Sequence, residues 1–215
     1  MVMTKGGPLM WFILINAIVA IGVFFERLFH YHRAQIHTHD FVNGILNSLR
    51  RGNILEARST CKDTAGPVAQ VVLAAVENHD RSRDEIREAV QDAGRVEVTR
   101  LERNLPILVT IAQVTPLIGF LGTVWGMIKI FMVIEKTQLA SPGQLAGGVW
   151  EALLTTAGGL VVAIPSYIAY NYLVSRVQGL VMDMERAANE VLTYLARRDD
   201  HVPFEDPVLI GDKQK

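Results

Sequence analysis

The chain has 215 residues, of which 50% are hydrophobic and 20% charged, and its formal net charge is −1. This composition is too apolar for an ordinary soluble domain of this size, and the near-neutral charge gives no basis for binding nucleic acid or an acidic ligand. The single cysteine, Cys61, excludes an internal disulfide framework and a CxxC-type metal or redox motif. Cys61 is interpreted as a small helix-face residue in a reducing compartment, in preference to a nucleophile.

The first apolar run covers residues 6–25 and contains no charged residue. A signal peptide is the alternative interpretation, but only Lys5 precedes the run and no small-x-small cleavage site follows it. The run therefore predicts a retained transmembrane helix over residues 8–26, after an N-terminal tail of residues 1–7. Trp11 is expected to anchor its outer end at the membrane interface.

Residues 27–104 carry a near balance of acidic and basic side chains, which is typical of a water-facing region. Ser82 and Glu85 have the spacing of a helix capping box. Apolar residues keep helical spacing from Ile86 to Leu105, so we expect this helix to continue into a second transmembrane helix, with Pro106 marking a kink or a boundary. Shorter helices are predicted before it, over residues 41–49, 54–61 and 68–77.

Four histidines, His30, His32, His37 and His39, follow the first apolar run. His-x-His spacing does not place two ligands on one face of a helix, and no cysteine pattern nearby supports zinc. They are interpreted as part of a polar segment at the lipid head groups, and no metal site is predicted.

Residues 104–175 contain only four charged side chains, Lys129, Glu135, Lys136 and Glu151. The two uncharged stretches are each long enough to cross a hydrocarbon layer of about 30 Å. The predicted order is a transmembrane helix over residues 105–134, a loop over 135–145, a transmembrane helix over 146–174, a cytoplasmic helix over 175–198 and a poorly ordered tail over 199–215. The predicted fold is therefore an all-α integral membrane protein with three transmembrane helices and long cytoplasmic helical extensions.

Basic residues near the predicted membrane helices indicate the orientation. Most lie on one side: Arg27, Arg33, Arg95, Arg100, Arg103, Arg176 and Arg186. That side is predicted to be cytoplasmic, which places the N-terminus outside and the C-terminus inside.

The second and third apolar helices contain small residues four positions apart, which allow close approach of helices in membranes. The pairs are Gly122 and Gly126, Gly148 and Ala152, and Gly159 and Ala163. Pro116 and Pro165 each leave one carbonyl without its helical partner. Thr110 and Thr115 are expected to bond back to their own helix.

Glu151 is the first candidate functional residue, because a carboxylate inside a membrane helix costs roughly 2.5–3.5 kcal/mol and normally faces a bundle interior or a wet path. At about 100° per residue, Thr155 and Gly158 share its face, whereas Thr156 lies about 140° away. Spacing alone therefore favours Thr155 as its companion. The alternative role for Glu151 is structural, as a neutral acid in an interhelical hydrogen bond or at a shallow, wet position.

Two segments, residues 115–126 (TPLIGFLGTVWG) and 150–165 (WEALLTTAGGLVVAIP), resemble the ExbB/TolQ proteins, which are related to MotA of flagellar stators. By this resemblance Thr123 matches the family's pore threonine, Glu151 its glutamate and Thr156 its second threonine. Lys129 departs from the pattern, since a neutral or polar residue is expected there. The helix-packing residues are taken to be Gly122, Gly126, Gly158, Gly159, Pro116 and Pro165.

The resemblance implies a homopentamer in the bacterial inner membrane around two single-helix partner chains of the ExbD/TolR type. A membrane aspartate of the partner would carry protons and drive a rotary motor. The motor's output would reach outer-membrane transport or envelope maintenance through a TonB/TolA-like protein. The transported ion is taken to be the proton, with sodium the alternative, and no bound cofactor is expected.

An enzyme is not predicted, because the hairpin holds no nucleophile–base pair. The remaining alternative is a membrane scaffold without ion conduction, in which Glu151 is purely structural. The sequence leaves open whether the chain is of the ExbB or the TolQ subtype.

Overall fold

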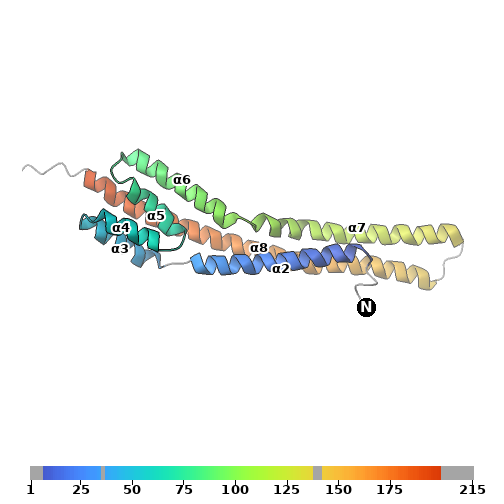
Figure 1. Ribbon diagram of the computed structural model, residues 1–215. Helices are drawn as coiled ribbons and strands as arrows, with labels where there is room; N and C mark the ends of the chain where they lie inside the picture. Colours follow the sequence, from blue (N-terminus) through green and yellow to red (C-terminus); the bar gives the residue numbers. More distant parts are fainter. Residues whose placement is uncertain (1–6, 35–36, 138–141, 200–215) are drawn as a thin grey trace, which may run out of the picture. The chain divides into compact units, whose positions relative to one another are not determined.

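The computed structural model describes residues 7–34, 37–137 and 142–199 (Figure 1). Within these ranges the chain is helical with short turns and has no β-strand, so the prediction of an all-α fold is confirmed. Residues 1–6 of the predicted N-terminal tail, residues 138–141 of the predicted loop and residues 200–215 of the predicted C-terminal tail lie outside the described ranges.

Seven helices are described, labelled as in Figure 1. They are α2 (Leu9–Ala34), α3 (Thr38–Arg50), α4 (Ile54–Asp63), α5 (Pro67–Glu77), α6 (Arg83–Glu102), α7 (Leu105–Thr137) and α8 (Pro142–Asp199). Three of these helices, α2, α7 and α8, contain stretches that are long and apolar enough to cross a membrane. The three predicted apolar helices are therefore present, and the third continues without interruption to Asp199.

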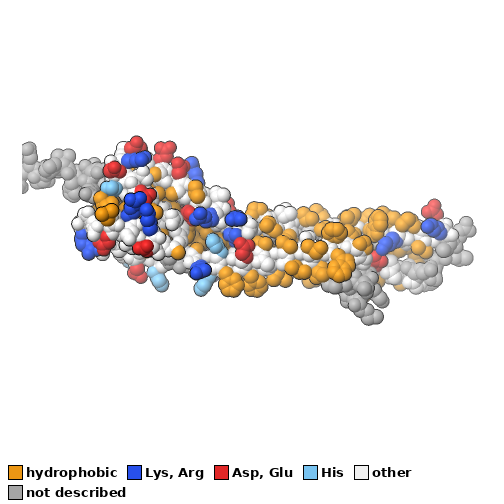
Figure 2. Space-filling model, viewed as in Figure 1, with side chains coloured by type: hydrophobic (Ala, Val, Ile, Leu, Met, Phe, Trp, Pro, Cys, Tyr) orange, Lys and Arg blue, Asp and Glu red, His pale blue; other side chains and the backbone are white. Residues whose placement is uncertain are grey.

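The chain divides into two compact units. The first contains residues 1–32 and 101–178, in which α2 and α7 lie along the first part of α8 (Figure 1). Hydrophobic side chains dominate the face of this unit shown in Figure 2. Many are largely exposed, among them Ile18, Phe120 and Val161, which are 63%, 65% and 70% exposed. Such a surface requires lipid or another protein to cover it.

The second unit contains residues 33–100 and 179–215, and its described part comprises α3 to α6 and the last turns of α8. Charged side chains of both signs cover the face shown in Figure 2. Its core is made of small and branched apolar residues, including Val42, Ile45, Leu49, Ala57, Val68, Val72, Val76, Ile86, Met184, Ala187 and Val191. This arrangement is that of a small water-facing helical bundle.

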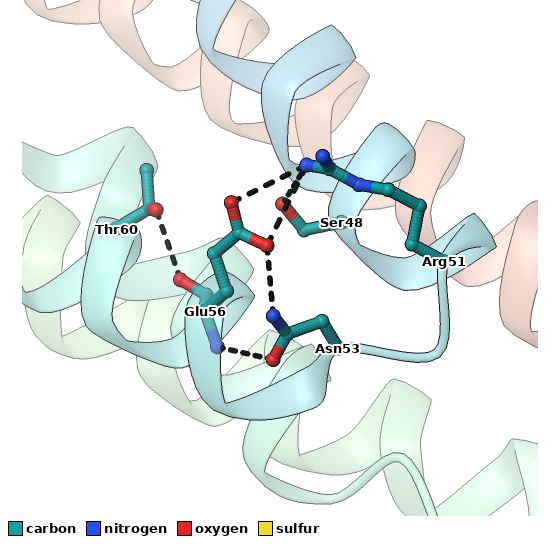
Figure 3. Close-up of polar contacts among 5 residues, drawn as sticks. All are labelled: Ser48, Arg51, Asn53, Glu56 and Thr60. Atoms are coloured by element: carbon teal, nitrogen blue, oxygen red, sulfur yellow. Dashed lines mark hydrogen bonds and ion pairs between the residues drawn. The ribbon is translucent and has the colours of Figure 1, made fainter.

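The turn between α3 and α4 is held by polar contacts (Figure 3). The Asn53 side chain accepts a hydrogen bond from the Glu56 backbone amide at 3.2 Å, which caps the first turn of α4. The Glu56 carboxylate in turn accepts from the Asn53 amide at 3.0 Å and from Arg51 at 3.3 Å. Gly52 adopts a positive φ of 72°, which glycine permits without strain. These contacts fix the direction in which α4 leaves α3.

Cys61 lies in α4 and is completely buried in the second unit. Burial, with a smaller contribution from the Glu77 carboxylate, raises the pKa of the Cys61 thiol to about 12. The thiolate is the reactive form, so its population at pH 8 is about a thousandfold lower than for a free cysteine.

We therefore expect Cys61 of the folded protein to resist maleimide labelling at pH 8 and to react fully in denaturant. Labelling kinetics followed by mass spectrometry measure this. Ser59→Cys, exposed on the same helix, is the matched control and should label rapidly. Rapid labelling of Cys61 in the folded protein would contradict its burial.

The helix that was expected to run from the second unit into the membrane, with a kink or a boundary at Pro106, is interrupted. The capping box at its start is confirmed, since Ser82 accepts from the Glu85 amide at 3.4 Å and the Glu85 carboxylate accepts from the Ser82 amide at 3.0 Å. However, α6 ends at Glu102 and α7 begins at Leu105. Asn104 between them has a φ of 70°, a left-handed conformation that asparagine tolerates better than most residues.

Polar contacts with α2 stabilise this interruption. The Asn104 amide donates to the Glu26 carboxylate at 3.0 Å, and the Tyr31 hydroxyl donates to the Leu101 carbonyl at 2.7 Å. Pro106 falls in the first turn of α7, where its missing N–H leaves no helical bond unmade. The boundary thus lies two residues before Pro106.

Candidate functional site

Helices α7 and α8 meet along a line of small side chains, which we call the small-residue seam. The seam consists of Gly119, Gly122 and Gly126 of α7 and of Gly148, Ala152, Thr155 and Gly159 of α8. A methyl group added to Gly126 would lie 2.8 Å from the Ala152 Cβ, and one added to Gly159 would lie 2.8 Å from the Thr115 carbonyl oxygen. The two backbones are therefore in direct contact, as the small-xxx-small spacing allows.

Gly158 lies outside the small-residue seam. A Cβ at Gly158 would lie 3.3 Å from the Met10 side chain of α2. The structure thus places Gly122, Gly126 and Gly159 between α7 and α8, and Gly158 between α8 and α2. Pro116 and Pro165 lie inside α7 and α8, which continue through them.

Glu151 forms an ion pair with Lys129 at the edge of the small-residue seam. The Lys129 Nζ lies 2.8 Å from the Glu151 Oε1, and the two side chains are 41% and 25% exposed. The backbone of Gly7 approaches the same carboxylate, since a Cβ built there would lie 2.5 Å from Oε1. Glu151, Lys129 and Gly158 therefore share one side of the hairpin, which we call the α2 flank.

Thr123 and Thr156 occupy the opposite side, which we call the threonine flank. The Thr156 hydroxyl crosses to α7 and donates to the Gly119 carbonyl at 2.9 Å. Thr123 is one turn along α7 from Gly119, and its hydroxyl donates to the Phe120 carbonyl at 2.6 Å. Thr123 and Lys129 are about 120° apart around α7, as Thr156 and Glu151 are about 140° apart around α8. Both threonines remain partly accessible.

Thr155 lies between these two flanks, inside the small-residue seam, and is only 1% exposed. Its hydroxyl donates within α8, to the Glu151 carbonyl at 2.7 Å and to the Ala152 carbonyl at 3.1 Å. Its side chain fills the space left by Gly122. Helical spacing had favoured Thr155 as the companion of Glu151, whereas of these two threonines it is Thr156 whose side chain is partly accessible.

A further polar contact joins α2 to the hairpin and was not expected from the sequence. The Asn16 amide of α2 donates to the Thr115 hydroxyl at 3.1 Å, and Thr115 is completely buried. Thr110, in contrast, bonds back to the Pro106 carbonyl at 2.7 Å, as expected. An asparagine within an apolar run was the available signal, since such a residue needs a partner inside the membrane.

The histidines considered for a metal site are not gathered in space. Among the residues that the structure describes, no group of three or more His, Cys, Asp or Glu side chains is placed to hold a metal ion. The His39 ring is hydrogen-bonded to Asn43 at 3.1 Å on the surface of α3.

Residues 63–186, which include α6, α7 and the small-residue seam, match the model of the MotA/TolQ/ExbB proton channel family. The chain belongs to this family. It is 41% identical to the Tol-Pal system protein TolQ of Haemophilus influenzae over 102 residues, covering 47% of this chain and 45% of that protein. It is 30% identical to the biopolymer transport protein ExbB-like 1 of a Synechocystis strain over 205 residues, covering 94% of this chain and 80% of that protein.

The biopolymer transport protein ExbB of Pseudomonas putida is 33% identical over 172 residues, covering 74% of this chain and 52% of that protein. Against this ExbB and the Haemophilus TolQ, the chain thus spans about half of the relative's length. The resemblance inferred from the two motifs is therefore confirmed at the level of the family. As a family member with three helices of membrane-spanning length, the chain is a membrane protein of the proton channel class.

Proposed function

We propose that the chain is the ring-forming subunit of a proton-driven motor, which assembles as a pentamer around two ExbD/TolR-like single-helix chains in the bacterial inner membrane. The observation that carries this proposal is an ionisable residue, Glu151, on an apolar hairpin of a proton channel family member. A carboxylate kept in an apolar helix is a functional feature by default. No bound cofactor is required, because the proton is itself the transported species.

The exposed apolar surfaces of α7 and α8 support assembly. Leu117, Phe120 and Val161 are each at least 65% exposed in the single subunit. In a ring, these surfaces would contact neighbouring subunits, partner helices or lipid. The distribution of arginines supports an orientation with the N-terminus in the periplasm and the second unit in the cytoplasm.

The two flanks have different roles in this proposal. The threonine flank faces the partner helices, and the hydroxyls of Thr123 and Thr156 line the path. Thr155, being buried in the small-residue seam, serves packing. Glu151 exchanges protons in, or beside, the transfer to the partner's aspartate, and Lys129 is its counter-ion in the subunit. The energy is passed to outer-membrane transport or envelope maintenance, with a TonB/TolA-like protein as the receiving partner.

The Lys129–Glu151 ion pair also favours a second candidate function. In a scaffold without ion conduction, the pair would simply fasten α7 to α8. The two functions predict different results when Glu151 and Lys129 are both replaced by neutral residues. This double substitution therefore tests the role of Glu151.

Native mass spectrometry of the detergent-purified chain should show a pentamer as the main species. The physical reason is the exposed apolar area of α7 and α8, which a single subunit leaves uncovered. Addition of an ExbD/TolR-type partner should add the mass of two partner chains to the same pentamer. A stable monomer under these conditions would contradict the ring.

Thr123→Val and Thr156→Val should each lower proton flux about threefold to tenfold, because valine keeps the shape and removes one hydroxyl from the path. Flux into liposomes containing the chain and its partner measures this. Thr110→Val is the matched control: like Thr123, Thr110 bonds to a carbonyl of its own helix, but it lies near the start of α7, away from the threonine flank, and the variant should conduct normally. Normal flux in both path variants would remove the threonine flank from the mechanism.

A further inference from the structure

An open groove lies on the second unit, between α6 and the last part of α8, with α5 at its base. Its volume is about 720 Å³. The lining residues are Val71 of α5, Arg87, Val90, Gln91, Gly94, Arg95, Val98 and Thr99 of α6, and Val181, Met184, Glu185, Ala188, Asn189 and Leu192 of α8. We call it the α6/α8 groove.

The α6/α8 groove has an apolar floor and a polar rim. Val90 and Met184 on the floor are buried, and Leu192 at one end is partly exposed. Arg87 and Arg95 stand on the α6 side of the rim, two turns apart. Such a groove suits an extended or helical peptide with apolar side chains beneath and acidic side chains beside the arginines.

The segment that follows α8 in the sequence has this chemistry. Residues 204–210 read FEDPVLI, with two adjacent carboxylates between apolar side chains. Pro207 disfavours a helix through this segment and favours an extended peptide. The segment carries two negative charges, whereas the rim, with Arg87, Arg95 and Glu185, carries one net positive charge.

The chain length allows residues 204–210 to reach the α6/α8 groove of the same subunit. Leu192 lies seven residues before the end of α8 at Asp199, a distance of about 10 Å along the helix. The five residues from Asp199 to Phe204 span up to about 17 Å when extended. Along α8 the groove runs from Val181 to Leu192, about 16 Å, which an extended seven-residue segment covers.

We propose that residues 204–210 bind in the α6/α8 groove of their own subunit. In this proposal Phe204 and the aliphatic residues 208–210 supply the apolar contact, and Glu205 and Asp206 supply the charge that complements Arg87 and Arg95. Arg95 pairs with Asp92 at 3.2 Å in the described residues, and both side chains are exposed. An exposed pair of this kind is weak, so a carboxylate of the segment can compete for Arg95. Phe204 contributes most of the apolar contact.

Disulfide crosslinking in the full chain tests the position of the segment. The background carries Cys61→Ala, which removes the single native cysteine. Gln91→Cys on the rim combined with Pro207→Cys should form an intramolecular disulfide under mild oxidation. Val96→Cys, about 140° round α6 from residue 91 and outside the groove lining, is the matched control with Pro207→Cys and should not.

A band of twice the subunit mass would show that the segment binds a second copy and would overturn the proposal, as would no crosslink at all. Arg87→Glu with Arg95→Glu should lower the crosslinking yield about fivefold, the effect of losing two exposed ion pairs. Glu205→Arg with Asp206→Arg in that variant should restore it. Far-UV circular dichroism of each variant shows whether the second unit remains folded. The crosslinking experiment does not measure proton flux. A negative result would therefore contradict this proposal without contradicting the proposed function.

Discussion

Replacing Glu151 with glutamine should abolish proton flux, by on the order of 100-fold, while the ring remains assembled. Glutamine keeps the volume and hydrogen bonding of glutamate but cannot bind and release a proton, and losing a positioned proton-transfer group typically has an effect of this size. Glu151→Asp should keep part of the flux, because aspartate is shorter but ionisable. The measurement is proton flux into liposomes that contain the chain and its ExbD/TolR-type partner.

Lys129 provides the control that separates transport from packing. Glu151→Gln alone leaves the Lys129 ammonium without its 2.8 Å partner, which is destabilising in an apolar setting. Glu151→Gln combined with Lys129→Gln removes both charges and should recover thermal stability without recovering flux. Recovery of flux in the double variant would mean that Glu151 only fastens α7 to α8, as in the scaffold function.

Replacing Gly159 with valine should prevent the hairpin from closing. The first added carbon would already lie 2.8 Å from the Thr115 carbonyl oxygen and 3.2 Å from the Gly119 Cα, and neither backbone atom can rotate away. Overpacking of this kind costs about 1–3 kcal/mol. A lower melting temperature and loss of the pentamer in native mass spectrometry are the expected results.

Gly147→Val is the matched control for the small-residue seam. Gly147 lies in the same helix, and a Cβ at this position would have no atom within 4 Å. This variant should therefore keep the wild-type melting temperature and the pentamer. Equal behaviour of the two valine variants would contradict the close contact between α7 and α8.

The features that local sequence decides were predicted well. Three apolar runs gave the three helices of membrane-spanning length, and the Ser82–Glu85 spacing gave a capping box that is present. Both depend on residues close together in the chain, where helical periodicity and hydrogen-bonding preferences act directly. A kink or a boundary was expected at Pro106, but the left-handed turn at Asn104 was not, because that conformation is held by Glu26 of another helix.

The candidate site was predicted less completely, because its contacts join distant residues. Spacing along α8 separates Glu151 from Thr156 around the helix, but it cannot tell which side α2 covers. The contact of Asn16 with Thr115, 99 residues away, and that of Lys129 with Glu151 needed the packed helices. Lys129 had been noted only as a departure from the family pattern.

The contact between Gly7 and Glu151 has a practical consequence for labelling experiments. Because the Gly7 backbone adjoins the carboxylate, an affinity tag or fluorescent domain fused at the N-terminus is tethered within a few residues of it. Such a fusion could obstruct access to Glu151 and imitate a loss-of-function variant. Reporters for this protein are better inserted at the Asn78–Arg81 turn between α5 and α6, which lies in the water-facing unit.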